Sequence, residues 1–189
     1  MFLMPILQKQ QDIYPSNLLD PDFTRSNPEW RWWAMYTRSR REKDLMRKLL
    51  AWHIAFYAPL IPRRSRSPRG RVRTSYVPLF PNYVFVLGDN ADRYQVMTTN
   101  CVAKYSSVEW PDRFVVELRQ IQRAILDNAP LTPEAKIEPG QEARVRSGPF
   151  KGYEGTILRR EGKTRLLMAV KFIDRGISME IDEGLLEPL

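Results

Sequence analysis

The sequence predicts an α+β protein with two domains: a sandwich of helices on an antiparallel sheet, followed by a small β-barrel. Three observations lead to this fold class. Strand-like apolar runs alternate with stretches of helical spacing over residues 30–127. Prolines then interrupt the pattern between residues 128 and 139. Beyond them, residues 140–189 hold short alternating strands, glycines and no helical spacing, which is typical of a small barrel.

The N-terminal part of the sequence predicts an arm followed by alternating strands and helices. Residues 1–29 lack periodicity, so we expect a flexible arm. The elements after it follow the order β-α-β-β-β-α-β-α. The expected strands are 32–36, 54–61, 71–77, 83–87 and 102–106, and the expected helices are 40–53, 90–97 and 112–127. Ser39 and Glu42 have the spacing of a capping box for the first helix, and Asn90 is the expected cap of the second.

The C-terminal part follows a proline-containing linker, which we expect at residues 128–139. Ala143 and Val145 alternate with charged residues, and the segment 177–182 alternates in the same way. Such alternation predicts strands with one buried face. It favours a stable barrel over residues 140–189.

Positive charge is concentrated in the N-terminal half. The chain carries 30 Lys and Arg against 22 Asp and Glu, a net charge of +8. Residues 30–78 contain 13 bases and two acids, whereas residues 136–189 contain ten bases and nine acids. Six arginines and no acid lie within residues 63–73, together with the turn residues Pro68 and Gly70. This pattern predicts a hairpin with a basic tip and a polyanionic partner, unless the charge only solubilises the surface.

The composition argues against several classes of protein. One Cys excludes an internal disulfide and favours a reducing compartment, and one His excludes a multi-His zinc site. No Ser/His/Asp pattern, Walker loop or paired-acid motif is present. No apolar run has the length of a membrane helix. We therefore expect a binding protein with no catalytic residue, metal or cofactor and no membrane association.

Two groups of residues resemble the NusG family of transcription elongation factors, which join an NGN domain to an SH3-like KOW barrel. The resembling residues are Trp32–Tyr36, Glu42 and Pro78–Val86 in the first half, and Pro139–Gly140, Val145, Gly148–Phe150, Gly152, Gly155 and Phe172–Arg175 in the second. Asn82 and the arginine-rich hairpin are closer to specialised, RfaH-like members of the family, whereas residues 171–181 are closer to the housekeeping form.

The resemblance implies a cytoplasmic, nucleoid-associated bacterial factor for elongation or antitermination, acting as a monomer. It implies that the NGN domain binds the clamp helices of the largest RNA polymerase subunit through Tyr36, Phe80, Pro81, Tyr83, Phe85 and Tyr105. It implies contacts to upstream or non-template DNA from Arg38, Arg66, Arg69, Arg71 and Arg73. It implies that the KOW barrel recruits a small-subunit ribosomal protein or Rho through Phe150, Phe172, Ile173 and Arg175.

The aromatic residues of the expected polymerase contact cannot all be exposed. Alternate positions of the strand 83–87 must face the core. Phe80 stands beside two prolines at the strand entrance, so we expect it to be the most exposed aromatic. Two other functions stay open: a ribosome-associated KOW-type RNA-binding protein, and a nucleic-acid enzyme, against which the missing catalytic set argues.

Overall fold

The computed structural model describes residues 9–189 except 67, 69, 71 and 137–138, and it forms two compact units, Met1–Glu109 and Trp110–Leu189. The division falls before helix α4 (Pro111–Leu126), whereas the sequence analysis placed the end of the first domain at residue 127. Within the described residues, no helix is both long and apolar enough to span a membrane.

A five-stranded antiparallel sheet forms the centre of the first unit and confirms the expected fold class. Its strands, in spatial order, are β1 (Ile13–Tyr14), β3 (Ala55–Tyr57), β6 (Tyr83–Gly88), β2 (Arg31–Thr37) and β7 (Val102–Ser107). Strand β6 is central and buried beyond Tyr83, as its continuous apolar sequence predicts.

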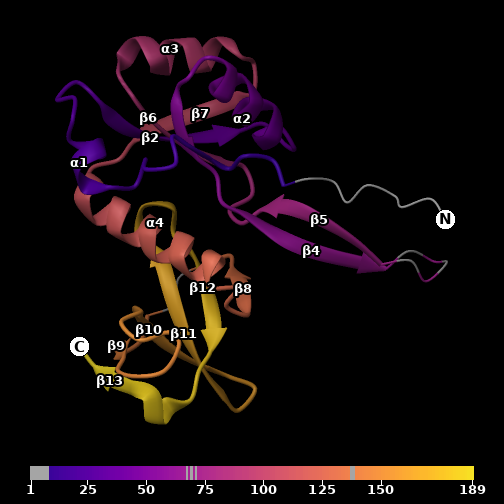
Figure 1. Cartoon of the computed structure of the whole chain (residues 1–189), viewed down its shortest axis with the longest axis vertical. Helices are drawn as coiled ribbons and strands as arrows, with labels where there is room; N and C mark the ends of the chain where they lie inside the picture. Colours follow the sequence, from indigo (N-terminus) through magenta and orange to yellow (C-terminus); the bar gives the residue numbers. More distant parts are fainter. Residues whose placement is uncertain (1–8, 67, 69, 71, 137–138) are drawn as a thin grey trace. The chain divides into compact units, whose positions relative to one another are not determined.

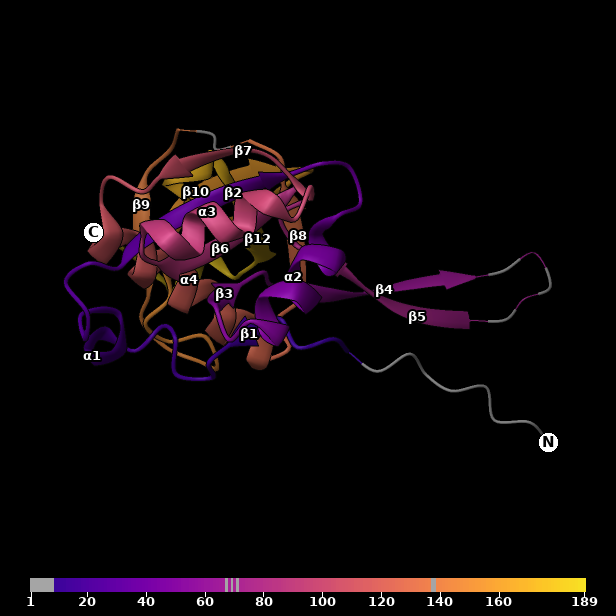
Figure 2. The same cartoon turned by 90° about the horizontal axis from the view of Figure 1, so that it is seen from above.

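Helices α2 (Glu42–Ala51) and α3 (Asn90–Thr98) lie on one face of this sheet, and a four-residue helix α1 (Pro21–Thr24) precedes β2 (Figure 1 and Figure 2). Leu45, Met46 and Leu49 recur at helical spacing, so α2 buries them in one core cluster with residues of β2, β3 and β6.

Two predicted helix caps are wrong. Helix α2 begins after Arg41, which has no side-chain acceptor, so Ser39 lies outside the helix; the Glu42 carboxylate accepts a hydrogen bond from the Asn82 N–H. Helix α3 is capped by Asp89 rather than Asn90, and Asp92 completes the capping box.

The prediction of a flexible N-terminal arm is wrong for residues 9–29, and residues 1–8 lie outside the described residues. Strand β1 pairs with β3, and Leu18 and Leu19 are buried. The buried leucines and the strand pairing order this segment, although its sequence shows no periodicity.

The arginine-rich segment forms the expected hairpin. Strands β4 (Leu60–Arg66) and β5 (Val72–Pro78) pair with each other as a separate two-stranded sheet. The hairpin projects away from the five-stranded sheet in both views (Figure 1 and Figure 2). The single strand expected at residues 54–61 is therefore two strands, separated at Ala58 and Pro59.

The second unit contains the expected small antiparallel barrel sheet. Its strands, in spatial order, are β13 (Leu186–Pro188), β9 (Glu142–Val145), β10 (Glu154–Arg160), β11 (Lys163–Val170), β12 (Arg175–Glu180) and β8 (Leu131–Glu134). Short 3-10 helices occupy Lys171–Ile173 and Glu183–Leu185.

Strand β8 lies inside the expected linker, so the linker prediction is wrong for these four residues. Thr132 pairs with Ser178 of β12, and the buried Glu134 carboxylate accepts a 2.5 Å hydrogen bond from the Ser178 hydroxyl. Pro133 is tolerated because β8 is an edge strand.

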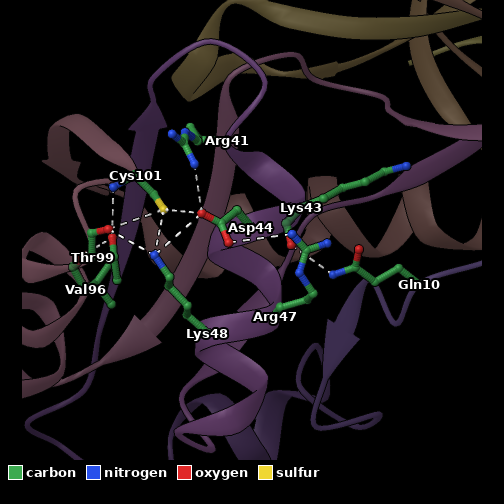
Figure 3. A network of polar contacts seen from close by, with 9 residues as sticks. All are labelled: Gln10, Arg41, Lys43, Asp44, Arg47, Lys48, Val96, Thr99 and Cys101. Carbon is green, nitrogen blue, oxygen red and sulfur yellow. Dashed lines mark hydrogen bonds and ion pairs between the residues drawn. The ribbon is translucent and has the colours of Figure 1, made fainter.

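A polar network ties α2 to the start of β7 (Figure 3). The buried Cys101 thiol donates to the Asp44 carboxylate at 3.3 Å, and the Lys48 ammonium lies 3.5 Å from that carboxylate and 3.1 Å from the Thr99 carbonyl oxygen. The hydrogen bond from Cys101, followed by the charge of Lys48, lowers the pKa of Asp44. The Cys101 thiol thus links the segment before β7 to α2.

Candidate functional site

A tight turn places the first tyrosine of the candidate site. The Tyr83 N–H donates to the Phe80 carbonyl oxygen at 3.1 Å, with Pro81 and Asn82 between them. Asn82 has φ 67°, so Pro and Asn occupy the two central positions that a type II turn requires of such residues. The buried Glu42 carboxylate accepts from the Asn82 N–H at 2.8 Å and fastens this turn to α2.

Tyr83 and Tyr36 form a pair of adjacent rings. They are register partners on β6 and β2, and their ring centroids lie 5.3 Å apart in an edge-to-face arrangement. Both side chains are half-buried. The Lys104 ammonium, on the neighbouring strand β7, lies 5.0 Å from the centroid of the Tyr36 ring. We call Tyr36, Tyr83 and Lys104 the tyrosine site.

Phe80 and Phe85 are part of the core, so the expectation that Phe80 is the most exposed aromatic is wrong. Phe80 is 2% exposed and Phe85 is 0% exposed. Phe80 packs edge-to-face on Phe85 at 6.1 Å, and Phe85 stacks against Tyr83 at 6.4 Å. The turn directs the Phe80 ring inwards, and the exposed residue of the turn is Pro81.

Tyr105 lies on the opposite face of the sheet from the tyrosine site. Tyr105 is the cross-strand partner of Met35, so both side chains lie on the same face of the sheet, and Met35 belongs to the core cluster under the helices. Its ring contacts Trp33 edge-to-face at 5.8 Å, and the Arg93 guanidinium lies 4.7 Å from its centroid. The structure therefore brings Tyr36 and Tyr83 together and separates Tyr105 from them.

The hairpin arginines are divided between two faces. Arg73 is directly opposite Ser65, so it shares a face with Ser65 and with Arg63 two positions away. Arg64 and Arg66 project from the other face, and all four arginines are exposed. Arg38 is also exposed, directly after β2. The predicted contacts Arg69 and Arg71 lie outside the described residues.

Helix α4 holds the barrel through side chains that bind its backbone. The Gln120 amide donates to the Glu154 carbonyl oxygen at 2.6 Å and accepts from the Glu154 N–H at 3.0 Å. The Glu117 carboxylate accepts from the Lys171 N–H at 3.0 Å, and burial raises the pKa of Glu117. The helix thus satisfies backbone groups of β10 and of the turn after β11.

The four predicted partner-binding residues of the barrel are buried or half-buried within the second unit. Phe172 packs edge-to-face on Phe114 of α4 at 6.1 Å, and Ile173 is buried. Phe150 stacks on Tyr153, with ring centroids 5.8 Å apart. The half-buried Arg175 donates to the Ala135 carbonyl oxygen at 3.4 Å.

Neither Lys104 nor the positioning role of Glu42 is evident from the sequence pattern. Lys104 belongs to the site because β7 pairs with β2 opposite Tyr36, and strand pairing leaves no local signal. Glu42 was identified as a resembling residue, but its capping-box spacing suggested a partner within its own helix.

Comparison with known proteins gives the following matches. A family model described as "Transcription termination factor nusG" matches residues 30–124, and one described as "KOW motif" matches residues 139–171. No curated protein matches. Among fourteen matching chains of solved structures is "Crystal Structure of MjSpt4:Spt5 complex conformation B", 14% identical to this chain with a TM-score of 0.25. That match covers 84% of this chain and 96% of that chain.

The first family match spans half of the 189 residues, and the KOW match follows it in the order that the family has. The matched segments include the turn, both tyrosines and the hairpin in the first unit and most of the barrel in the second. The NusG family is a family of non-catalytic transcription factors. The chain therefore belongs to the NusG family of transcription elongation factors.

Proposed function

We propose that this protein acts in transcription elongation or antitermination by binding the clamp helices of the largest RNA polymerase subunit through the tyrosine site. The observation that carries the proposal is the Tyr36–Tyr83 pair. It places two partly exposed rings side by side within the family-matched segment.

The chemistry of the tyrosine site suits a helical partner. A tyrosine ring offers a large apolar surface with a polar tip, and such residues dominate the energy of many interfaces. Pro81 is exposed next to the pair, and Lys104 adds a positive charge beside the Tyr36 ring. Apolar side chains from one helix face would pack against the rings, while the phenol groups remain able to bond to water or to the partner.

The buried phenylalanines support this binding indirectly. Phe85 stacks against the Tyr83 ring, and Phe80 packs behind Phe85. A ring that is already held in one orientation loses less conformational entropy on binding. Phe80 and Phe85 therefore preorganise the site, while Tyr36 and Tyr83 make the contact.

We further propose that the basic hairpin contacts upstream duplex DNA or the non-template strand while the tyrosine site holds the polymerase. Exposed arginines on both hairpin faces, and no acid in residues 60–78, support this contact. Arginine neutralises phosphate and also stacks on unpaired bases. Arg38 and the predicted Arg69 and Arg71 extend the same proposal.

The barrel is proposed to recruit a ribosomal protein or Rho near Phe150 and Phe172. Both rings are half-buried, so each keeps part of its surface accessible. Part of the Phe172 ring is already covered by Phe114 of α4. A partner at this position would therefore contact α4 as well as the barrel.

The polymerase proposal is tested with the double variant Tyr36→Ala/Tyr83→Ala. Interface aromatics commonly contribute about 2 kcal/mol or more each, so the variant should bind core polymerase at least about 100-fold more weakly. Affinity is measured by interferometry with core polymerase and with an isolated clamp-helix fragment.

Two single variants serve as controls. Tyr94→Ala removes an exposed tyrosine from α3 and should leave the affinity unchanged. Phe80→Ala opens a cavity in the core and should lower the free energy of unfolding by about 3–5 kcal/mol. A folded double variant that binds as tightly as the wild type would show that the tyrosine site is not the polymerase contact.

A further inference from the structure

The segment before the family-matched residues attaches to the base of the basic hairpin. We propose that Asp12 is a positioning residue that fixes the direction in which the hairpin leaves the sheet. Its consequence for nucleic-acid binding rests on the proposed function of the hairpin, but its effect on hairpin geometry does not.

Asp12 binds the chain on both sides of the point where the hairpin begins. Its carbonyl oxygen accepts from the Ala58 N–H at 2.8 Å, which continues the pairing of β1 with β3. Its carboxylate accepts from the N–H of Leu60, the first residue of β4, at 3.1 Å. One residue thus binds the chain directly after β3, at Ala58, and again at Leu60, the first position of the hairpin.

A second connection reaches the other hairpin strand. The Gln10 amide donates to the Lys43 carbonyl oxygen at 3.0 Å, and the Lys43 ammonium donates to the Tyr76 carbonyl oxygen of β5 at 2.5 Å. The Lys9 ammonium lies 2.8 Å from the Asp12 carboxylate. The N-terminal segment is therefore linked to β4 directly and to β5 through α2.

The hairpin needs such an anchorage because of its shape. A two-stranded sheet is only marginally stable by itself, and no third strand pairs with β4 or β5 among the residues that the structure describes. Leu60 is buried, whereas Pro62–Arg66 are exposed, so the body of the unit holds β4 at its base.

Small changes at the base are amplified at the far end. A strand rises about 3.3 Å per residue, so β4 spans about 20 Å from Leu60 to Arg66. A rotation of about 10° at Leu60 would move Arg66 by about 3–4 Å, which exceeds the tolerance of a hydrogen bond.

Removal of Asp12 should change the affinity for nucleic acid in opposite directions if Asp12 positions the hairpin and if it acts only through its charge. Asp12 is negatively charged, so its removal should strengthen binding to a polyanion if charge alone matters. If Asp12 positions the arginines, its removal should weaken binding, because a mobile hairpin loses more entropy when it binds.

The direct test measures hairpin geometry in the full chain without nucleic acid. Spin labels at Ser65→Cys and Ser107→Cys, both exposed positions, are combined with Cys101→Ser. We expect Asp12→Ala to broaden the label–label distance distribution by double electron–electron resonance. Asp12→Asn keeps an acceptor for the Leu60 N–H and should keep the narrow distribution.

Controls keep this test decisive. Asp20→Ala removes an exposed carboxylate of the same segment and should match the wild type. If Asp12→Ala fails to fold, Asp12→Ser serves instead. The serine side chain remains polar, but its oxygen lies one bond closer to the backbone and so farther from the Leu60 N–H. An unchanged distribution in the folded Ala or Ser variant overturns the proposal.

The functional consequence is measured on an elongation complex with an exposed non-template strand. Asp12→Ala should bind about 10- to 100-fold more weakly, as expected for a lost hydrogen bond to a charged group, with an unchanged salt dependence. Asp12→Asn should bind at least as tightly as the wild type. Tighter binding by Asp12→Ala would overturn the positioning role.

The two proposals fail separately. If replacing the hairpin arginines changes neither affinity nor salt dependence, the proposed DNA contact is wrong. The distance measurement still decides whether Asp12 positions the hairpin.

Discussion

Single side chains hold the proposed interface in place from a distance. Glu42 fastens the turn that carries Tyr83, and its loss would release the Asn82 N–H. Asp44, two residues later, connects α2 to β7, which carries Lys104. Each carboxylate therefore fastens α2 to a segment next to a residue of the tyrosine site, and neither belongs to the site.

The lowered pKa of Asp44 leads to a prediction about acid stability. Its ionised form is favoured in the folded state, so its contribution is complete above its ordinary pKa of 3.8 and is lost as the pH falls through the lowered value. Asp44→Asn should therefore unfold at a lower denaturant concentration than the wild type near neutral pH.

The difference between the two proteins should shrink as the pH falls below 3.8, because the unfolded state then binds a proton at Asp44 while the folded state binds it only at the lowered pKa. Urea unfolding followed by circular dichroism across this range measures it. Asp22→Asn, at an exposed position, is the control. A difference that stays constant down to the most acidic point would contradict the role given to the Asp44 charge.

The residue-scale prediction for Phe80 failed for a physical reason. Proline neighbours place a residue in a turn, but they do not determine whether its ring turns towards the core. The ring of Phe80 packs on Phe85, which is five positions away along the chain and on the next strand. The burial of Phe85, by contrast, followed from its place in a continuous apolar strand.

At the scale of elements, the hairpin has the clearest expected behaviour. The four hairpin arginines that the structure describes form two pairs on opposite faces, Arg63/Arg73 and Arg64/Arg66. Each lost phosphate contact on a single strand lowers the log–log salt slope by about 0.7, so the pair that faces DNA should lower it by about 1.4.

We expect the two double-alanine variants to differ, because an exposed hairpin lying against DNA presents one face to it. Both should keep wild-type affinity for the isolated clamp helices. Fluorescence anisotropy over a salt series on an elongation complex measures the slopes. If both slopes equal that of the wild type, these arginines only solubilise the hairpin.

The elements that the sequence revealed are those with local signals. Turn residues predicted the hairpin, and helical spacing predicted α2 and α4. Strands β1 and β8 were missed because two to four residues show no periodicity, and their partners are distant: Ile13 pairs with Tyr57 and Thr132 with Ser178. The same limit hid the contact of Asp12 with Leu60 and the position of Lys104.

At the scale of the whole molecule, helix α4 sets where the compact units divide. Most of it belongs to the segment matched by the NusG family model, yet its side chains bind the backbone of the barrel. Its spacing predicted an amphipathic helix, but amphipathicity does not specify which surface the helix covers. The surface that α4 covers is defined by Gln120 and Glu117, which bind backbone groups of the folded barrel.

The central claim is that this chain binds RNA polymerase directly. Mass photometry of the wild type with purified core polymerase, and in parallel with purified ribosomes, tests it. We predict a complex of one chain per polymerase that forms without nucleic acid and is displaced by the clamp-helix fragment. The absence of such a complex at concentrations at which the chain binds ribosomes would contradict direct polymerase binding and favour a ribosome-associated RNA-binding protein.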